Sequence, residues 1–292
     1  MARPPGRWRG AWICQQGSAP AGSYKERGAE VMVAAAARRG IAELFLDSSG
    51  NAGFAVARAA AARGLRCTVL VPASTPAVKV ERIRAAGGRA ELISGDRDAT
   101  HLAALEWRRL LPYAAPFFQP AFQAGVATLA WELWEELGGR LPEHWLLPVG
   151  NGQLLMGLGM GLELLRRAGA IARLPALHAV QLAGYASLHP AGLGTPQPGP
   201  PTAAGVAIAQ PPRRADMLAW LDRTGGDVTV VSEEQIAAAR AELANAGWRA
   251  DPTGAAAFAG YCARPDLRAA GRPAGLPADP GCLVVISSLE GE

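Results

Sequence analysis

Short apolar runs alternate with alanine-rich segments along most of this chain, and the alternation limits the folds that it can adopt. Residues 44–46 and 67–71 are β-rich runs, and each lies next to a segment of helical composition that ends at glycine. Further strands are predicted at residues 12–14, 90–93, 145–149, 178–182, 228–231 and 282–286. Strands and helices joined by short connections predict an α/β fold, with parallel-rich sheets covered by helices.

The bulk composition indicates a globular protein with one large domain or two smaller ones. The 292 residues are 50% hydrophobic and 18% charged, and the formal net charge is only +4. Basic residues are scattered and do not interleave with aromatic residues, so we expect no nucleic-acid partner. No apolar run is long enough to span a bilayer, and no apolar signal segment follows the basic first residues. We therefore expect no membrane association and a cytoplasmic location.

The cysteines and histidines do not form a recognisable metal site. Four cysteines are far apart in the sequence and lack a CxxC pair, and the four histidines lack an HxxxH pair. We expect four buried free thiols and no bound metal.

Lysine is rare in this chain, which makes its few amines informative. Of the 29 basic residues only Lys25 and Lys79 are lysines, and Lys25 lies in the polar stretch Gly-Ser-Tyr-Lys-Glu-Arg-Gly of residues 22–28. An arginine stays protonated and cannot form an imine, whereas a lysine amine can form one and can then act as a base. Taken alone, this stretch leaves Lys25 open as a solvated charge or as a nucleophile.

Three loops place small polar residues between a predicted strand and a predicted helix, where backbone N–H groups can bind an anion. They are residues 48–51, residues 150–153 and, more weakly, residues 251–254. The second loop lacks the third glycine of a dinucleotide fingerprint and the acidic residue that should follow it. No GxxxxGK[ST] or GxSxG sequence is present. The interpretations that remain for this loop are a binding site for a single phosphate and an ordinary turn between a strand and a helix.

An imine-forming lysine combined with a phosphate cradle suggests pyridoxal phosphate, whose aldehyde bonds a lysine and whose ring accepts electrons. Residues 22–29, GSYKERGA, resemble the GSFKDRGA motif of pyridoxal-phosphate enzymes of fold type II, the tryptophan-synthase-β-like group. Residues 48–53, SSGNAG, and 148–153, PVGNGQ, are similar to two further loops of that group. The second has the form common in threonine synthases. Residues 174–181 and 251–257 also resemble threonine-synthase segments, in family order.

The resemblance implies two three-layer αβα domains with parallel-rich sheets and the cofactor in the cleft between them. Residues 1–40 with 124–292 would form the larger, cofactor-binding domain, and residues 41–123 the smaller one. Lys25 would form the Schiff base and move protons, and Asn51 would bond the ring hydroxyl of the cofactor. Ser288, with Ser287 as the alternative, would face the pyridine nitrogen. The backbone would hold the phosphate at Gly150, Asn151, Gly152, Gln153 and Leu154, and the substrate carboxylate would lie at Ser48, Ser49, Gly50 and Asn51.

The implied activity is β/γ-elimination or replacement on a small amino acid by a lyase, with a homodimer as the implied assembly. Threonine-synthase-like conversion of O-phosphohomoserine to threonine is the leading candidate. A serine/threonine dehydratase or a cysteine-synthase-like enzyme is the alternative. The chain also departs from the family: Cys14-Gln15-Gln16 replaces the usual acidic and lysine residues, and residues 287–292 are a reduced signature. These departures keep open a cofactor-binding regulatory paralogue.

Overall fold

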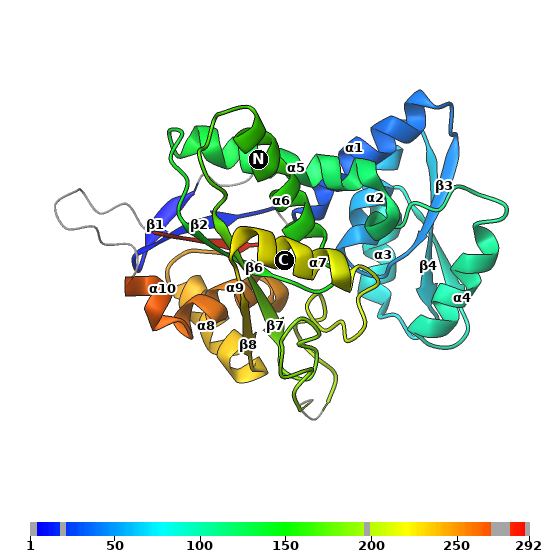
Figure 1. The fold of residues 1–292 in the computed structure, drawn as a ribbon. Helices are drawn as coiled ribbons and strands as arrows, with labels where there is room; N and C mark the ends of the chain where they lie inside the picture. Colours follow the sequence, from blue (N-terminus) through cyan, green and yellow to red (C-terminus); the bar gives the residue numbers. More distant parts are fainter. Residues whose placement is uncertain (1–4, 18–21, 196–198, 270–280, 290–292) are drawn as a thin grey trace. The chain divides into compact units, whose positions relative to one another are not determined.

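A computed structural model of the chain describes residues 5–17, 22–195, 199–269 and 281–289. The residues form two compact units, Met1–Tyr24 with Ala127–Glu292 and Lys25–Val126, here called the larger and the smaller unit. Figure 1 labels the helices and strands. Helix α5, Pro120–Glu136, contains the boundary between the two units.

A six-stranded sheet in the order β1-β2-β9-β6-β7-β8 is the centre of the larger unit. Strand β1 pairs antiparallel with β2, and all other neighbours are parallel. The strands are β1 Gly6–Trp8, β2 Ala11–Gln15, β6 His144–Pro148, β7 Ala176–Leu182, β8 Val228–Val231 and β9 Cys282–Ile286. Every residue of β9 is buried, because a central parallel strand is covered on both faces, and its sequence is accordingly an unbroken apolar run.

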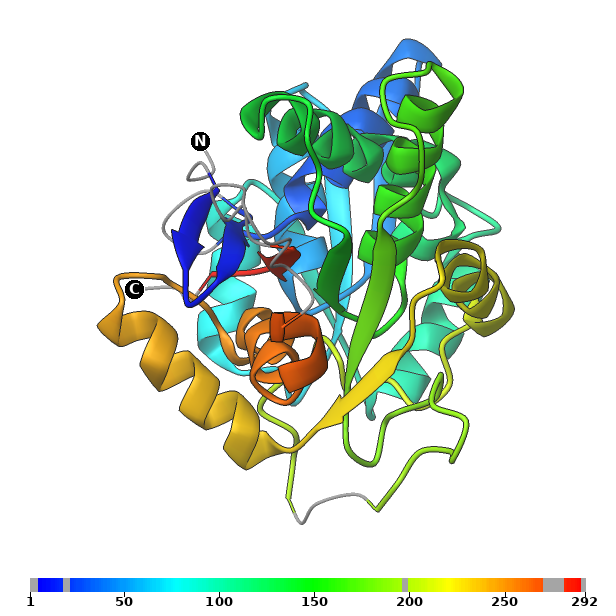
Figure 2. The same cartoon turned by 60° about the vertical axis from the view of Figure 1, so that its left-hand side comes forward.

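Helices cover both faces of this sheet (Figure 2). Helices α8, Glu233–Asn245, and α9, Pro252–Cys262, lie on one face, and α6, Gln153–Arg167, and α7, Arg214–Thr224, lie on the other. The short helix α10, Pro265–Ala269, follows α9. Side chains of a strand alternate between faces, so Val284 and Ile286 join the core cluster under α8 and α9.

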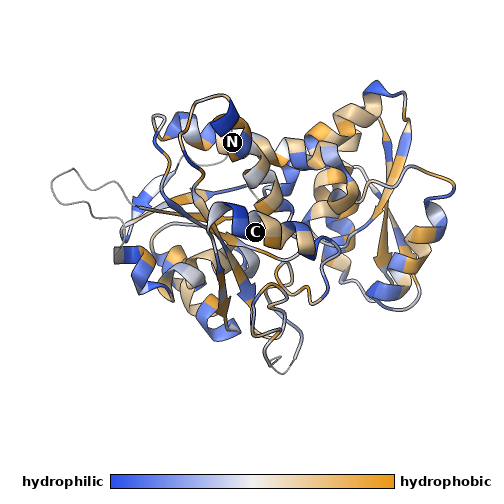
Figure 3. Ribbon diagram, in the orientation of Figure 1, coloured by the Kyte–Doolittle hydropathy of each residue, from blue (hydrophilic) through white to orange (hydrophobic). Residues whose placement is uncertain are grey.

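A three-stranded parallel sheet in the order β3-β4-β5 is the centre of the smaller unit. Hydrophobic residues are frequent along the strands of both units (Figure 3). Phe45, Leu70 and Ala104 form a core cluster of the smaller unit. The elements are α1 Lys25–Arg38, β3 Glu43–Asp47, α2 Asn51–Ala61, β4 Arg66–Pro72, α3 Ala77–Ala85, β5 Arg89–Ile93, α4 Arg97–Trp107 and the 3₁₀ turn Pro116–Phe118.

The predicted strands are all present. Helix α8 begins with a capping box, in which Ser232 and Gln235 exchange hydrogen bonds. Four elements were not predicted from the sequence: β1, α7, α10 and the 3₁₀ turn Pro116–Phe118. Strand β1 is only three residues long and is joined to β2 by Arg9 and Gly10, both with positive φ. Helix α7 begins at a residue that gives no side-chain cap, so no local start signal precedes it.

Glu163 joins α6 to α7 through three arginines. Its carboxylate accepts hydrogen bonds from Arg166 and Arg167 on the next turn, at 2.8–2.9 Å, and pairs at 2.7 Å with Arg223 of α7. The side chain of Glu163 is only 8% exposed. Hydrogen bonds from Arg166 and Arg167 lower the pKa of Glu163 from its ordinary 4.5 to about 2.

Replacement of Glu163 by glutamine should therefore lower the free energy of unfolding at neutral pH. The size of this decrease should depend on pH. Because the folded-state pKa is depressed, the stabilisation is fully present above about pH 4.5 and is lost as the pH falls toward about 2. Urea unfolding at several pH values should show the wild-type and Glu163→Gln curves converging over this interval. Glu106→Gln, which breaks an exposed pair with Arg109, is the control and should change little. A Glu163→Gln effect that is independent of pH would contradict this assignment.

No helix within the described residues is long and apolar enough to cross a membrane. Likewise, the described histidine, cysteine, aspartate and glutamate residues contain no group of three or more that could hold a metal ion.

Candidate active site

The turn from β6 to α6 combines a buried strand end with uncapped amide donors at a helix start. Val149 donates its N–H to Val180 O at 2.9 Å, which fixes the end of the strand. Gly152 then takes φ 80°, in the left-handed region, and serves as the N-cap of α6. Because glycine has no side chain to accept from the first N–H groups of the helix, these donors are not capped locally. They and the helix dipole favour an anion.

Two close approaches show why this turn needs glycine. A Cβ built on Gly150 would lie 2.1 Å from the carbonyl oxygen of Gly205, and one on Gly152 would lie 2.1 Å from Sδ of Met217 in α7. The Gly205 oxygen is backbone and cannot easily move, and at Gly152, where the Met217 side chain could shift, the positive φ itself favours glycine. The two glycines thus let neighbouring segments close over the turn. The turn is therefore a shaped cradle, which an ordinary surface turn would not require.

The loop before α9 lies against the same cradle. Gly205 donates its N–H to Oγ1 of Thr253 at 3.0 Å, which links the residues beside Gly150 to the start of α9. Asp251 caps α9 by accepting from Gly254 N–H at 2.7 Å. The loop of residues 251–254, the weakest of the three anion-loop predictions, is thus connected to the second loop through Gly205.

Ser288 lies at the same end of the sheet, just after β9. Its Oγ donates to Asp251 at 2.6 Å, and its carbonyl accepts from Asp251 N–H at 3.2 Å. A Cβ on Gly254 would lie 2.4 Å from Ser288 O, so α9 begins in direct contact with this serine. Both Ser287 and Ser288 are 2% exposed. The structure gives Ser288, rather than Ser287, the hydroxyl contact that holds α9.

The residues that precede Lys25 are tied to this same strand end. Ser23 forms a β-bridge with Ser288, and Tyr24 donates its N–H to Ser287 O at 3.0 Å. Lys25 is the next residue and the first of α1. The loops of residues 150–153 and 251–254, Ser288 and the stretch before Lys25 therefore converge where β2, β6 and β9 end. In parallel α/β sheets this carboxyl edge is where ligands bind.

Helix α1 is positioned within the smaller unit by close helix packing. A Cβ on Gly28 would meet the ring of Phe122 at 2.6 Å, and one on Gly125 would meet the carbonyl oxygen of Arg27 at 2.3 Å. The first turns of α1 and α5 thus touch through glycine. Glu26 of α1 also pairs with Arg58 of α2 at 2.9 Å.

The loop of residues 48–51 connects β3 to α2 in the smaller unit. A Cβ on Gly53 would lie 2.0 Å from Ser48 O, so the loop folds back onto the first turn of α2. Gly50 is the N-cap and makes no side-chain cap bond, which leaves the first amides of α2 available to an anion. Asn51, the first helical residue, accepts at Oδ1 a hydrogen bond of 3.1 Å from Nη1 of Arg82.

Sequence reasoning missed two residues of these arrangements, Arg82 and Gly205, and it missed the contact of Asp251 with Ser288. Arg82 is one arginine among many and lies in α3, away from any motif. Gly205 lies in the long Pro/Gly-rich loop, where composition indicates irregular structure but not which glycine contacts the cradle. Only the capping position of Asp251 carried a local signal.

The thiols and histidines do not supply an alternative centre. All four cysteines are free; Cys14, Cys67 and Cys282 are buried as expected, but Cys262 is partly exposed. Burial raises the pKa of Cys67 to about 12 and that of Cys282 to about 11, so both stay protonated at neutral pH.

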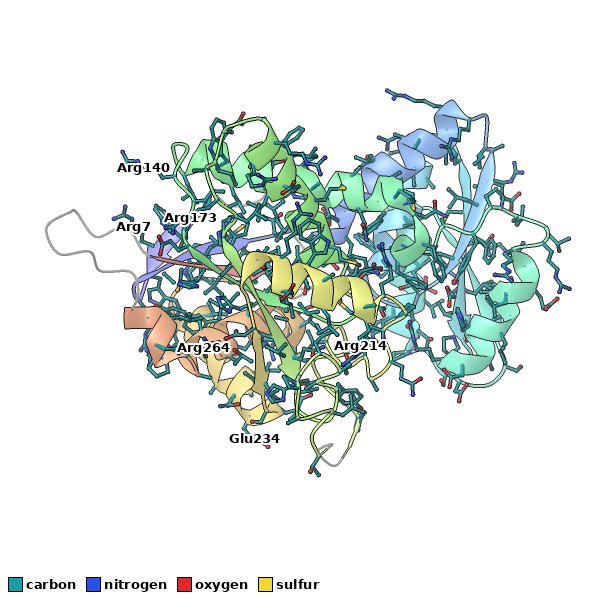
Figure 4. All side chains as sticks on the ribbon, in the orientation of Figure 1. Arg7, Arg140, Arg173, Arg214, Glu234 and Arg264 are labelled. Carbon is teal, nitrogen blue, oxygen red and sulfur yellow. The ribbon has the colours of Figure 1, made fainter. Side chains whose placement is uncertain are left out.

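The histidine pair is fixed at the amino-terminal half of the strands. His144 Nδ1 and His178 Nε2 are 3.0 Å apart, and His178 Nδ1 is 2.6 Å from Asp227. Asp227 also accepts from Arg264, labelled in Figure 4, at 2.8 Å. Burial and the neighbouring His178 lower the pKa of His144. These groups stabilise the fold away from the carboxyl edge of the sheet.

Pyridoxal phosphate fits the residues that are present. The glycine cradle and the uncapped start of α6 suit a phosphate, and Ser288 offers a buried hydroxyl on the same sheet edge. Lys25 follows the segment bound to Ser287 and Ser288, and its side chain carries an amine of the kind that an aldehyde can bond.

Comparison with known proteins agrees with this chemistry. Residues 11–280 match the family model described as pyridoxal-phosphate dependent enzyme. The L-serine dehydratase/L-threonine deaminase of Mus musculus is 35% identical over 149 residues, which are 50% of this chain and 45% of that protein. Threonine synthase of Methanosarcina acetivorans is 28% identical over 270 residues, 89% of this chain and 67% of the synthase. The chain thus spans about half the length of the first relative.

Solved structures show the same fold. A fungal L-serine ammonia-lyase from Rhizomucor miehei superimposes with a TM-score of 0.79 at 22% identity, covering 99% of this chain and 94% of that one. Maize serine racemase gives 0.77 at 20% identity, covering 97% and 85%. The predicted α/β class with parallel-rich sheets, its fold type II assignment and the predicted cofactor are confirmed. This chain belongs to the family of pyridoxal-phosphate dependent enzymes.

Proposed function

We propose that this protein converts O-phosphohomoserine to threonine, as a threonine-synthase-like member of its family. The observation that supports this most directly is the 28% identity to a threonine synthase, which extends over 89% of this chain. The PVGNG form of the turn at the start of α6 is consistent with it. A cytoplasmic location, a homodimer and the division into residues 1–40 with 124–292 and residues 41–123 stay predictions.

In this proposal the cradle residues hold the cofactor phosphate. The N–H groups of Gly150, Asn151, Gly152, Gln153 and Leu154 would donate to it. The contact of Gly205 with Gly150 narrows the space around the turn, which would exclude water and strengthen these charge-assisted bonds. The buried hydroxyl of Ser288 would face the pyridine nitrogen.

The remaining roles concern the substrate. The loop of Ser48, Ser49, Gly50 and Asn51 would receive the α-carboxylate on the uncapped amides of α2. When bound, pyridoxal phosphate supplies an electron sink next to the α-carbon. Lys25, which would bond the cofactor at rest, would then take the α-proton on Nζ and return it later in the reaction. The amine is the only group assigned to proton movement.

A second candidate is a serine/threonine dehydratase. It is favoured by the 35% identity to the mouse L-serine dehydratase/L-threonine deaminase over half of this chain. The two activities share the cofactor roles above and differ in the substrate and in the bond that is broken. A cysteine-synthase-like activity on O-acetylserine is the third hypothesis. The fourth hypothesis is a paralogue that binds the cofactor but has no catalytic activity.

Turnover assays of the protein with bound pyridoxal phosphate distinguish these four hypotheses. With O-phosphohomoserine we expect release of phosphate and formation of threonine in equal amounts. Ammonium and a 2-oxo acid from serine or threonine, without phosphate release, would instead establish the dehydratase. Acetate release from O-acetylserine with sulfide would indicate cysteine synthesis. A protein that absorbs visible light with the cofactor but turns over none of the four substrates would be the non-catalytic paralogue.

A further inference from the structure

The hydrogen bond between Arg82 and Asn51 fixes the direction of an amide that has a proposed role at the cofactor. An asparagine amide has one accepting and one donating end, and the two are alike in shape. A guanidinium only donates, so Nη1 of Arg82 at 3.1 Å can be satisfied only by Oδ1 of Asn51. The NH₂ end of Asn51 is therefore on the other branch of the amide, where it can donate to an acceptor.

Arg82 is itself held in place by an aromatic ring. Its guanidinium lies over the ring of Phe54 with 4.1 Å from Cζ to the ring centroid, and Phe54 is one turn along α2 from Asn51. The guanidinium of Arg58 lies over the same ring at 5.5 Å. Arg82 is neither buried nor fully exposed. A stacked, charge-assisted donor holds its acceptor more firmly than a mobile surface arginine would.

We propose that Arg82 is a positioning residue: it orients Asn51 so that the amide NH₂, and not the amide oxygen, is presented to the ring oxygen of pyridoxal phosphate. That ring oxygen carries negative charge in the lysine-bound cofactor and so needs a donor. Without Arg82 the Asn51 amide could rotate and present its Oδ1 atom instead. That atom would repel the negatively charged ring oxygen of the cofactor. The inference rests on the proposed role of Asn51, and it adds a residue from α3 that acts through another side chain.

A double-mutant cycle on cofactor affinity tests this inference. We expect Arg82→Met to raise the dissociation constant for pyridoxal phosphate about tenfold, the loss of roughly one hydrogen bond. In an Asn51→Ala background the same substitution should change the constant less than about twofold, because Arg82 then has no amide to orient. Arg82→Lys, which keeps a donor-only cation, should recover most of the affinity.

Controls separate orientation from a general structural effect. Arg84 lies on the same helix as Arg82 and forms an exposed ion pair with Glu81. Arg84→Met should therefore leave the dissociation constant for pyridoxal phosphate unchanged. Urea unfolding of the cofactor-free variants should show that both Arg82→Met and Arg84→Met are folded under the conditions of the titration, so that a lower affinity does not reflect loss of folded protein. If the Arg82→Met effect persists undiminished in the Asn51→Ala background, Arg82 does not act through Asn51 and the inference is wrong.

The outcome for the wild type distinguishes this inference from the cofactor role on which it rests. A wild-type protein that binds no pyridoxal phosphate would overturn both. A wild-type protein that binds it, with an Arg82→Met variant of equal affinity, would overturn only the role of Arg82.

Discussion

Replacement of Lys25 by alanine is expected to abolish the visible absorbance that pyridoxal phosphate should give when it is bound to the wild-type protein. Turnover should fall on the order of a thousandfold or more, because the same amine bonds the cofactor and moves the proton. The chain offers an unusually clean control, since Lys79 is its only other lysine and is exposed on α3. Lys79→Ala should keep both the absorbance and the activity.

The site of attachment can be read without relying on activity. Borohydride fixes a lysine-bound pyridoxal group irreversibly, and peptide mass spectrometry then shows which lysine carries it. We expect the label on the peptide that contains Lys25 and none on the peptide that contains Lys79. Label on Lys79, or a wild-type protein that remains colourless with excess cofactor, would refute the role of Lys25.

Replacement of Gly150 by alanine will reduce cofactor affinity about a hundredfold. The added Cβ would stand 2.1 Å from the backbone oxygen of Gly205, so the turn or the neighbouring loop must move. Backbone contacts cannot yield as a flexible side chain can. Displacement of two of the N–H donors would remove about 3 kcal/mol of phosphate binding, which corresponds to this factor.

Gly169 provides the matched control for Gly150 because it lies just beyond the other end of α6. It has φ 75° and open space around a Cβ, so Gly169→Ala strains the backbone by about 1–2 kcal/mol without touching the turn. Titration with pyridoxal phosphate should give wild-type affinity for Gly169→Ala, despite its lower unfolding midpoint. Wild-type affinity in Gly150→Ala would show that the cradle does not hold the cofactor.

Much of the fold and of the candidate site could be predicted from local patterns in the sequence. Residues 150–153 could be recognised because a strand end, two glycines and a helix start are adjacent in the chain. The same holds for residues 48–51. The sequence leaves Ser287 as an alternative to Ser288 at the pyridine nitrogen, and the contact of the Ser288 hydroxyl with Asp251 could not be predicted because the two residues are far apart in the chain.

What the sequence did not reveal depends on contacts between distant segments. Arg82 has no local signal, because its partner Asn51 is reached only when α3 packs beside α2. Gly205 matters only because Gly150 passes close to it in space. Helix α7 gave no start signal, yet it packs on β7 and α6, so tertiary packing rather than propensity decides its structure.

The place of β9 between β2 and β6 has a consequence for how the protein forms during synthesis. Residues of β2 are made early, but their parallel partner β9 lies more than two hundred residues later in the chain. Until that segment leaves the ribosome, β2 and β6 each lack a neighbour on the side that β9 will fill. Loop-closure entropy makes such late, distant pairing slow, and open strand edges invite aggregation. The contacts of Ser23 with Ser288 and of Tyr24 with Ser287 are thus among the last parts of the larger unit to be completed.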